Sequence, residues 1–156
     1  MVTMKTQIQI RTNERVDFIQ RKGYKIIQNP EVFCFGIDAV LLADFAKAKK
    51  KARVLDIGTG TGVIPILMEA RYENGNYVGI DIQEDMVDMA KRSVAMNQLE
   101  EKIQIVHLDV NNIREKYGPN SFDIVTTNPP YMKSKAGLIS ENTSKMIARH
   151  ELTCSL

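Results

Sequence analysis

The sequence has few cysteines, no tryptophan and no long apolar run, and these absences exclude several classes of protein. Cys34 and Cys154 are too few for the disulfide framework of a small secreted domain, and they do not form a close pair that could begin a metal site. The first residues lack the apolar centre of a signal peptide, and no stretch approaches the roughly 20 apolar residues that span a bilayer. We therefore expect a cytoplasmic protein with no membrane contact and no metal.

The formal net charge of +2 over 156 residues is too small to identify a partner. The positive residues are nevertheless clustered, in one run at 47–53 and in a second group between Lys133 and His150. Such a cluster is usually a solvated face. The second group follows a proline-rich turn that is a candidate for chemistry, so it is consistent with an anionic substrate there.

The order of apolar patterns predicts an α/β fold in about one domain. An alternating segment at 7–10 and a hairpin over 16–28 indicate β structure, and Asp38 is expected to cap a helix over 39–49. Further on, short apolar strands alternate with helical patterns, which implies a doubly wound parallel sheet. The expected strands are 53–57, 77–81, 103–108 and 122–126, and the expected helices are 62–71, 84–97 and 112–116.

A glycine-rich turn, with Gly58, Gly60 and Gly62, follows the first strand of this sheet. Glycine lets the backbone pass close to a ligand, and the start of the next helix attracts negative groups. A dinucleotide fingerprint needs glycine or alanine where this chain has Val63, and the Gly-Lys-Ser/Thr of a P-loop is missing. The turn alone is weak evidence, since structural turns also use glycine.

An aspartate lies at or beside the carboxyl end of each of the first three strands of this sheet, at Asp56, Asp81 and Asp109. Ligands of such sheets bind at these ends. Asp81 can accept both hydroxyls of a ribose, and Asp109 can accept a hydrogen bond from an adenine amine. Each aspartate alone is more often a helix cap or a loop residue, but together with the glycine turn they predict a pocket for a nucleoside without phosphates.

The last strand runs into Asn-Pro-Pro-Tyr at 128–131, a pattern suited to holding a planar amine. Two prolines supply no N–H donors, so the local backbone offers only carbonyl acceptors. Asn128 adds an acceptor through its side-chain oxygen, and Tyr131 adds a flat aromatic face. Alone, this segment is equally consistent with a proline-rich turn after a strand.

In order and spacing, these motifs resemble those of class I S-adenosylmethionine-dependent methyltransferases across residues 52–131. The resemblance implies a Rossmann-like fold and S-adenosyl-L-methionine as the cofactor. The segments 35–43 and 148–151 are similar to a narrower group of transferases, which methylates the exocyclic amine of an adenine in valine tRNA next to the anticodon. The resemblance therefore implies nucleic acid binding and tRNA processing.

The resemblance also implies roles for the motif residues. The cofactor would be bound by Phe35, Asp38, Asp56, Gly58, Gly60, Gly62, Asp81, Ile82, Asp109, Val110 and Asn128. The catalytic residues would be Asn128, Pro129, Pro130 and Tyr131, and the substrate would contact Tyr131, Lys133, Lys135, Arg149 and His150. No strong general base is required, because the proton can leave after transfer.

Residues 1–156 are expected to form one methyltransferase domain, with an N-terminal β extension over 1–34 and the cofactor-binding core over 35–156. The family's last strands have no counterpart, so we expect a truncated domain with an exposed sheet edge, which favours a homodimer. Other functions fit the same motifs: a glutamine methyltransferase acting on a protein release factor, a guanine-amine RNA methyltransferase, or a non-catalytic cofactor-binding fragment. The basic residues from Lys133 to Arg149 favour RNA as the substrate.

Overall fold

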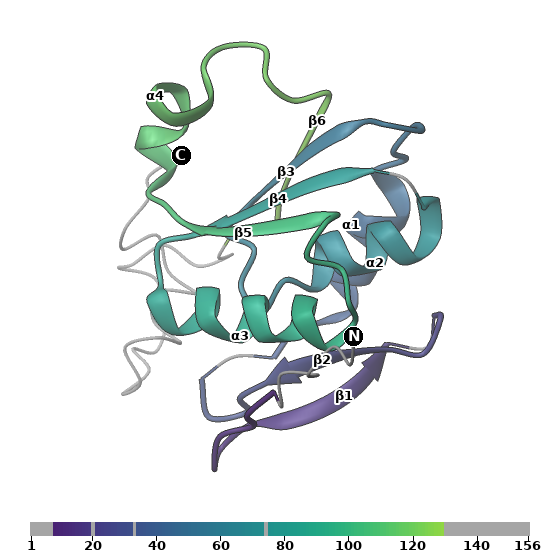
Figure 1. Ribbon diagram of the computed structural model, residues 1–156, viewed down its shortest axis with the longest axis vertical. Coiled ribbons are helices and arrows are strands. Elements are labelled where there is room, and N and C mark those ends of the chain that lie inside the picture. Colours follow the sequence, from purple (N-terminus) through teal and green to yellow (C-terminus); the bar gives the residue numbers. More distant parts are fainter. Residues whose placement is uncertain (1–7, 20, 33, 74, 130–156) are drawn as a thin grey trace, which may run out of the picture.

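The computed structural model describes residues 8–19, 21–32, 34–73 and 75–129. In this part of the chain, a hairpin precedes a parallel sheet whose strands alternate with helices (Figure 1). The elements are β1 (Arg15–Ile19), β2 (Tyr24–Gln28), α1 (Ile37–Phe45), β3 (Arg53–Ile57), α2 (Val63–Tyr72), β4 (Asn76–Asp81), α3 (Glu84–Met96), β5 (Ile103–His107), the 3-10 turn η1 (Val110–Asn112), α4 (Ile113–Tyr117) and β6 (Ile124–Thr127).

The described part of the sheet has four strands in the order β5-β4-β3-β6, and every neighbouring pair is parallel. Parallel neighbours require crossover connections, which α2, α3 and α4 supply. The strand order reverses direction after β5, when the chain crosses to the far side of β3 to form β6. The predicted α/β class with a Rossmann-like parallel sheet is therefore confirmed.

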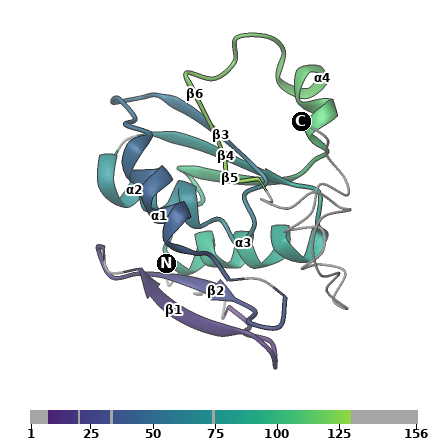
Figure 2. The same cartoon turned by 180° about the vertical axis from the view of Figure 1, so that it is seen from behind.

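The helices cover both faces of the sheet. Figures 1 and 2 show α1, α2 and α3 on one face, with the β1–β2 hairpin beyond α3, and α4 on the other. On the first face Val54 and Ile105 belong to the main core, whereas Leu55 and Ile80 face Ile113 of α4. This alternation along β3 and β4 explains why both strands read as continuous apolar runs in the sequence.

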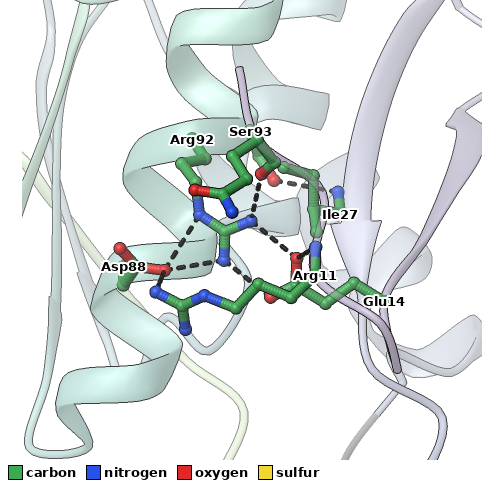
Figure 3. Close-up of polar contacts among 7 residues, drawn as sticks. Arg11, Glu14, Ile27, Asp88, Arg92 and Ser93 are labelled. Atoms are coloured by element: carbon green, nitrogen blue, oxygen red, sulfur yellow. Dashed lines mark hydrogen bonds and ion pairs between the residues drawn. The ribbon is translucent and has the colours of Figure 1, made fainter. Parts of the chain in front are cut away.

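The N-terminal hairpin is fixed to α3 by polar contacts as well as apolar ones. Ile27 is fully buried, and its backbone N–H donates to the hydroxyl of Ser93 at 2.9 Å. Arg92 forms ion pairs with Glu14 and Asp88, both at 2.6 Å (Figure 3). The predicted β extension thus packs against the helix that follows β4.

Three local expectations are wrong. Residues 8–10 of the segment expected as a strand are not in one: among the described residues the first strand, β1, begins at Arg15 and pairs with β2. Asp38 does not cap α1: the helix begins at Ile37, its N-cap is the extended Gly36, and Asp38 lies in the first turn. The helix also ends at Phe45, before the lysine run, in turns closed by Lys47 N–H to Phe45 and Ala52 N–H to Lys49.

Candidate functional site

The glycine turn between β3 and α2 has a backbone that only glycine adopts easily. Gly58, Gly60 and Gly62 have φ values of 68°, 56° and 82°, in the left-handed region. A Cβ at Gly58 or Gly60 would have no neighbour within 4 Å among the described residues, whereas one at Gly62 would lie 3.2 Å from Cβ of Ala90. The first two glycines therefore shape a turn that faces open space, and the third allows α2 and α3 to pack closely.

Asp81, at the end of β4, is held against this turn. Its carboxylate accepts the N–H of Gly60 at 2.8 Å and the N–H of Gln83 at 2.9 Å. Burial raises the pKa of Asp81 above its usual value, and these backbone donors oppose the rise. Each carboxylate oxygen has a second lone pair, so the group can also accept hydroxyl donors from a ligand. The structure brings together two motifs that lie 21 residues apart.

Asp56, at the carboxyl end of β3, is 1% exposed. One of its oxygens accepts the hydroxyl of Thr126 at 2.7 Å, and the other has no hydrogen-bond partner among the described residues. Burial raises the pKa of Asp56 to about 7, with a further contribution from the Asp81 carboxylate, while nearby hydroxyls oppose the rise. The contact joins β3 to β6 two residues before Asn128.

Thr126 belongs to none of the sequence motifs. The sequence indicates its role only by placing a polar residue in an apolar strand. Its position follows from the register, in which Asp56 is opposite Thr126 and Ile57 is opposite Thr127. The Thr127 hydroxyl also donates to the Ile57 carbonyl at 3.1 Å. Two side-chain contacts therefore fix the strand that leads into Asn-Pro-Pro-Tyr.

Asn128 leaves β6 beside the first turn of α1. Its side-chain N–H donates to the carboxylate of Asp38, a residue 90 positions earlier in the chain. Phe35, just before α1, is held by its backbone N–H, which donates to the buried Gln28 side chain at 3.0 Å. The structure thus places the first turn of α1 next to Asn128.

The end of β5 lies beside that of β4. Asp109 accepts the backbone and side-chain N–H groups of Asn111 at 2.8 and 2.9 Å and so caps η1 (Val110–Asn112). The Leu108 N–H donates to the Asp81 carbonyl at 3.0 Å, and a ring nitrogen of His107 lies 2.9 Å from the Ile82 carbonyl. Ile82 itself is 39% exposed, and it offers an apolar surface next to the Asp81 carboxylate.

Some of the predicted site residues are outside the described residues. Of the Asn-Pro-Pro-Tyr segment, Asn128 and the half-buried Pro129 are described. The predicted residues outside the described ranges are Pro130, Tyr131, Lys133, Lys135, Arg149 and His150.

Among the described residues, no cluster of three or more acidic, histidine or cysteine side chains could hold a metal ion. The helices in the same ranges are all too short or too polar to cross a membrane. The polar groups that do converge are those at the carboxyl ends of β3, β4, β5 and β6, where parallel sheets of this type bind ligands.

Comparison with known proteins points to one family. The family model of the methyltransferase small domain matches residues 23–152. The chain is 31% identical over 134 residues to a tRNA1(Val) (adenine(37)-N6)-methyltransferase of Bacteroides thetaiotaomicron, covering 85% of this chain and 54% of that one. It is 30% identical over 146 residues to the protein of the same description from Porphyromonas gingivalis, covering 90% and 56%. The chain thus spans about half the length of the curated relatives it matches.

Solved structures agree on the fold. A SAM-dependent methyltransferase from Agrobacterium tumefaciens has a TM-score of 0.60 at 17% identity, covering 94% of this chain and 50% of that one. A Pyrococcus abyssi tRNA (uracil-54, C5)-methyltransferase in complex with S-adenosyl-L-homocysteine has a TM-score of 0.58 at 18% identity, covering 76% and 28%. At these identities the likeness establishes the arrangement of strands and helices alone.

Proposed function

Because the chain belongs to the methyltransferase small domain family, we propose that it takes part in transferring a methyl group from S-adenosyl-L-methionine to the exocyclic amine of an adenine in tRNA. The observation that carries this proposal is the convergence of the glycine turn, Asp81 and Asn128 at the carboxyl ends of neighbouring strands. Two relatives at 30% identity or more are described as adenine methyltransferases of a tRNA, which supports this acceptor over the others.

The residues at these strand ends fit a nucleoside-containing cofactor. The open space beside Gly58 and Gly60 admits a ligand close to the backbone, and Ile82 offers an apolar surface next to the Asp81 carboxylate. In the proposed complex Asp81 accepts the ribose hydroxyls. The adenine would be held by Ile82, Asp109 and Val110, and the amino-acid end by Phe35, Gly58 and Gly60, with Asp56 nearby. When bound, S-adenosyl-L-methionine supplies an electrophilic methyl group.

The acceptor amine would be held by Asn128 and Pro129. An adenine amine is a poor nucleophile because its lone pair is delocalised into the ring. Hydrogen bonds from its two N–H groups to the Asn128 side-chain oxygen and the Pro129 carbonyl favour a pyramidal nitrogen and stabilise the positive charge that develops on transfer. Pro130 limits the backbone to acceptors.

We propose that the tRNA is contacted by Tyr131 and by basic residues later in the chain. Tyr131 stacks on the target base, which must leave the RNA stack to reach the pocket. Lys133, Lys135, Arg149 and His150 contact the RNA backbone, as expected for basic residues near phosphates.

We further propose that residues 1–156 form a single domain, with the β extension over 1–34 and the core over 35–156. The contacts between the hairpin and α3 support a single domain. The protein would act in the cytoplasm, where its tRNA partner is found. It would form a homodimer through the outer edge of β6, because among the described strands β6 pairs only with β3.

The direct test is transfer of a labelled methyl group onto tRNA, followed by mass spectrometry of the nucleosides. We expect N6-methyladenosine in tRNA and no label in a release factor added in its place. Label on guanosine, or on the release factor, would instead identify one of the two alternative methyltransferases.

The matched variant for this test is Asn128→Ala. It should leave binding of S-adenosyl-L-homocysteine within about twofold but reduce transfer about 100-fold or more, as for the loss of one preorganised hydrogen-bonding group. Calorimetry and initial rates measure the two quantities on the same preparation. Unchanged turnover in this variant would exclude Asn128 as the acceptor residue.

A further inference from the structure

We infer that Asp38 is a positioning residue whose carboxylate determines which end of the Asn128 amide faces the acceptor amine. The inference rests on the proposed function, since it concerns the same acceptor site. The observation that carries it is the hydrogen bond from the Asn128 side-chain N–H to an Asp38 oxygen, across 90 residues of sequence. No sequence motif connects these two residues.

An asparagine amide has two orientations of nearly the same shape, related by exchange of its oxygen and nitrogen. Only the orientation with the oxygen toward the substrate can accept a hydrogen bond from an amine. An ionised carboxylate has acceptors and no donor, so it selects the amide nitrogen. With the nitrogen of Asn128 bound to Asp38, the oxygen belongs to the opposite end of the planar group. The reverse orientation would set two N–H groups of Asn128 against those of the substrate.

The fold holds both members of this pair in place. On one side, α1 is anchored by the buried Ala39 and Ala43, which fixes the first turn that carries Asp38. On the other side, hydroxyls of Thr126 and Thr127 bond to β3 immediately before Asn128. The contact therefore joins two rigid elements.

Gly36 provides a second, independent observation. A Cβ built at this glycine would overlap the Asp38 carboxylate oxygen, although the backbone at Gly36 is extended, with φ of −103°, and suits any residue. The space over Gly36 is thus occupied by the Asp38 carboxylate. Replacing Gly36 with alanine leaves the charge of Asp38 intact but forces its carboxylate to move.

This role differs from the one that the sequence predicts for Asp38, which is contact with the amino-acid end of the cofactor. A cofactor contact predicts that Asp38→Asn weakens cofactor binding. A positioning role predicts that the same change lowers turnover through Asn128, because an asparagine at position 38 can both donate and accept and so no longer selects one amide orientation.

The kinetic test measures turnover on tRNA and affinity for S-adenosyl-L-homocysteine in the same variants. We expect Asp38→Asn and Gly36→Ala each to lower kcat by about 10-fold to 100-fold, the value of a hydrogen bond to a charged group, with affinity changed less than about twofold. Asp44→Asn, an exposed position on the same helix, is the control and should keep wild-type turnover.

A double-mutant cycle tests the coupling between the two residues. In the Asn128→Ala background, Asp38→Asn should cause no further loss, because the amide that it positions is gone. Independent losses in the two backgrounds, or a loss of cofactor affinity as large as the loss of turnover, would overturn the inference.

A spectroscopic test needs no substrate and separates this inference from the proposed function. In ¹⁵N-labelled wild-type protein, the side-chain NH₂ signals of Asn128 should show a proton protected from exchange, and the protection should disappear in Asp38→Ala and Gly36→Ala but not in Asp44→Asn. Protection that survives in both variants would overturn the positioning role. If protection behaves as expected but no transfer onto tRNA occurs, the positioning of Asn128 stands and the tRNA assignment fails.

Discussion

At the residue scale, the carboxylates of the site have different surroundings, and these surroundings predict different behaviour. Asp56 is buried beside one hydroxyl donor, Asp81 accepts two backbone N–H groups, and Asp38 accepts an amide N–H. The sequence predicts that Asp56 and Asp81 lie at strand ends and that Asp38 lies at the start of a helix. It cannot distinguish them, because burial and hydrogen-bond partners come from elements distant in the chain.

Asp56 should make stability depend on pH. Its pKa is about 7 in the folded protein against 3.8 ordinarily, so between these values the folded state holds a proton that the unfolded state has released. Stability must then fall as the pH rises through this window. The effect is at most about 4 kcal/mol, since a difference of one in pKa is worth about 1.4 kcal/mol.

Asp56→Asn removes this charge without changing the shape of the side chain. The stability of the variant relative to wild type should increase as the pH rises from about 4 to about 7, as measured by urea unfolding across that range. The Thr126 hydroxyl can still donate to the amide oxygen. A constant difference between the two proteins at every pH would show that Asp56 does not titrate there.

Asp81→Asn should weaken binding of S-adenosyl-L-homocysteine by about 10-fold to 100-fold, as expected when hydrogen bonds to a charged group are lost. The new amide would also set an N–H group against one of the backbone donors, Gly60 or Gln83. Calorimetry measures the change, with the exposed Glu84→Gln as the control. Wild-type affinity in Asp81→Asn would contradict a ribose-binding role.

At the element scale, the local sequence pattern predicts the bounds of an element well where that element is regular and buried. The strand expected at 53–57 agrees with β3, and the expected hairpin agrees with β1 and β2 to within a residue. The strand expected from the alternation at 7–10 is not formed by residues 8–10, because two apolar side chains that pair with no strand among the described residues do not make a sheet. The start of α1 was misplaced because aspartate is a typical helix N-cap residue. Here the Asp38 carboxylate instead accepts a hydrogen bond from Asn128.

The junction between the hairpin and α3 has a buried polar contact that can be tested. Ser93→Ala leaves the buried N–H of Ile27 without its acceptor, and an unsatisfied buried donor costs about 1–3 kcal/mol. The free energy of unfolding should fall by that amount in urea titrations. Lys91→Ala, two residues earlier on the exposed side of α3, should change it by less than about 0.5 kcal/mol.

At the scale of the whole molecule, the described sheet ends at β6, directly next to the proposed acceptor site. Val125, in this strand, is 56% exposed, and Leu41 and Phe45 expose apolar side chains along α1. The order of the strands in the sheet is set by pairing between residues far apart in the chain, and no local pattern specifies that pairing. The sequence therefore predicts which segments are strands, but not which strands lie side by side. A strand whose outer edge has no partner among the described strands, and which exposes an apolar side chain, favours pairing with another chain.

The homodimer proposed through this edge should therefore be sensitive to charge on β6. Val125→Lys places a charge on an exposed position of the edge strand, a change that opposes edge-to-edge pairing. Sedimentation velocity over a range of concentrations should show a dimer for wild type and a monomer for the variant. Gln104→Lys adds the same positive charge at an exposed position of β5, the strand at the other edge of the described sheet, and should leave the dimer intact. A dimer that persists in Val125→Lys, or is lost equally in Gln104→Lys, would place the interface away from β6, because only a contact at that strand responds to one charge and not the other.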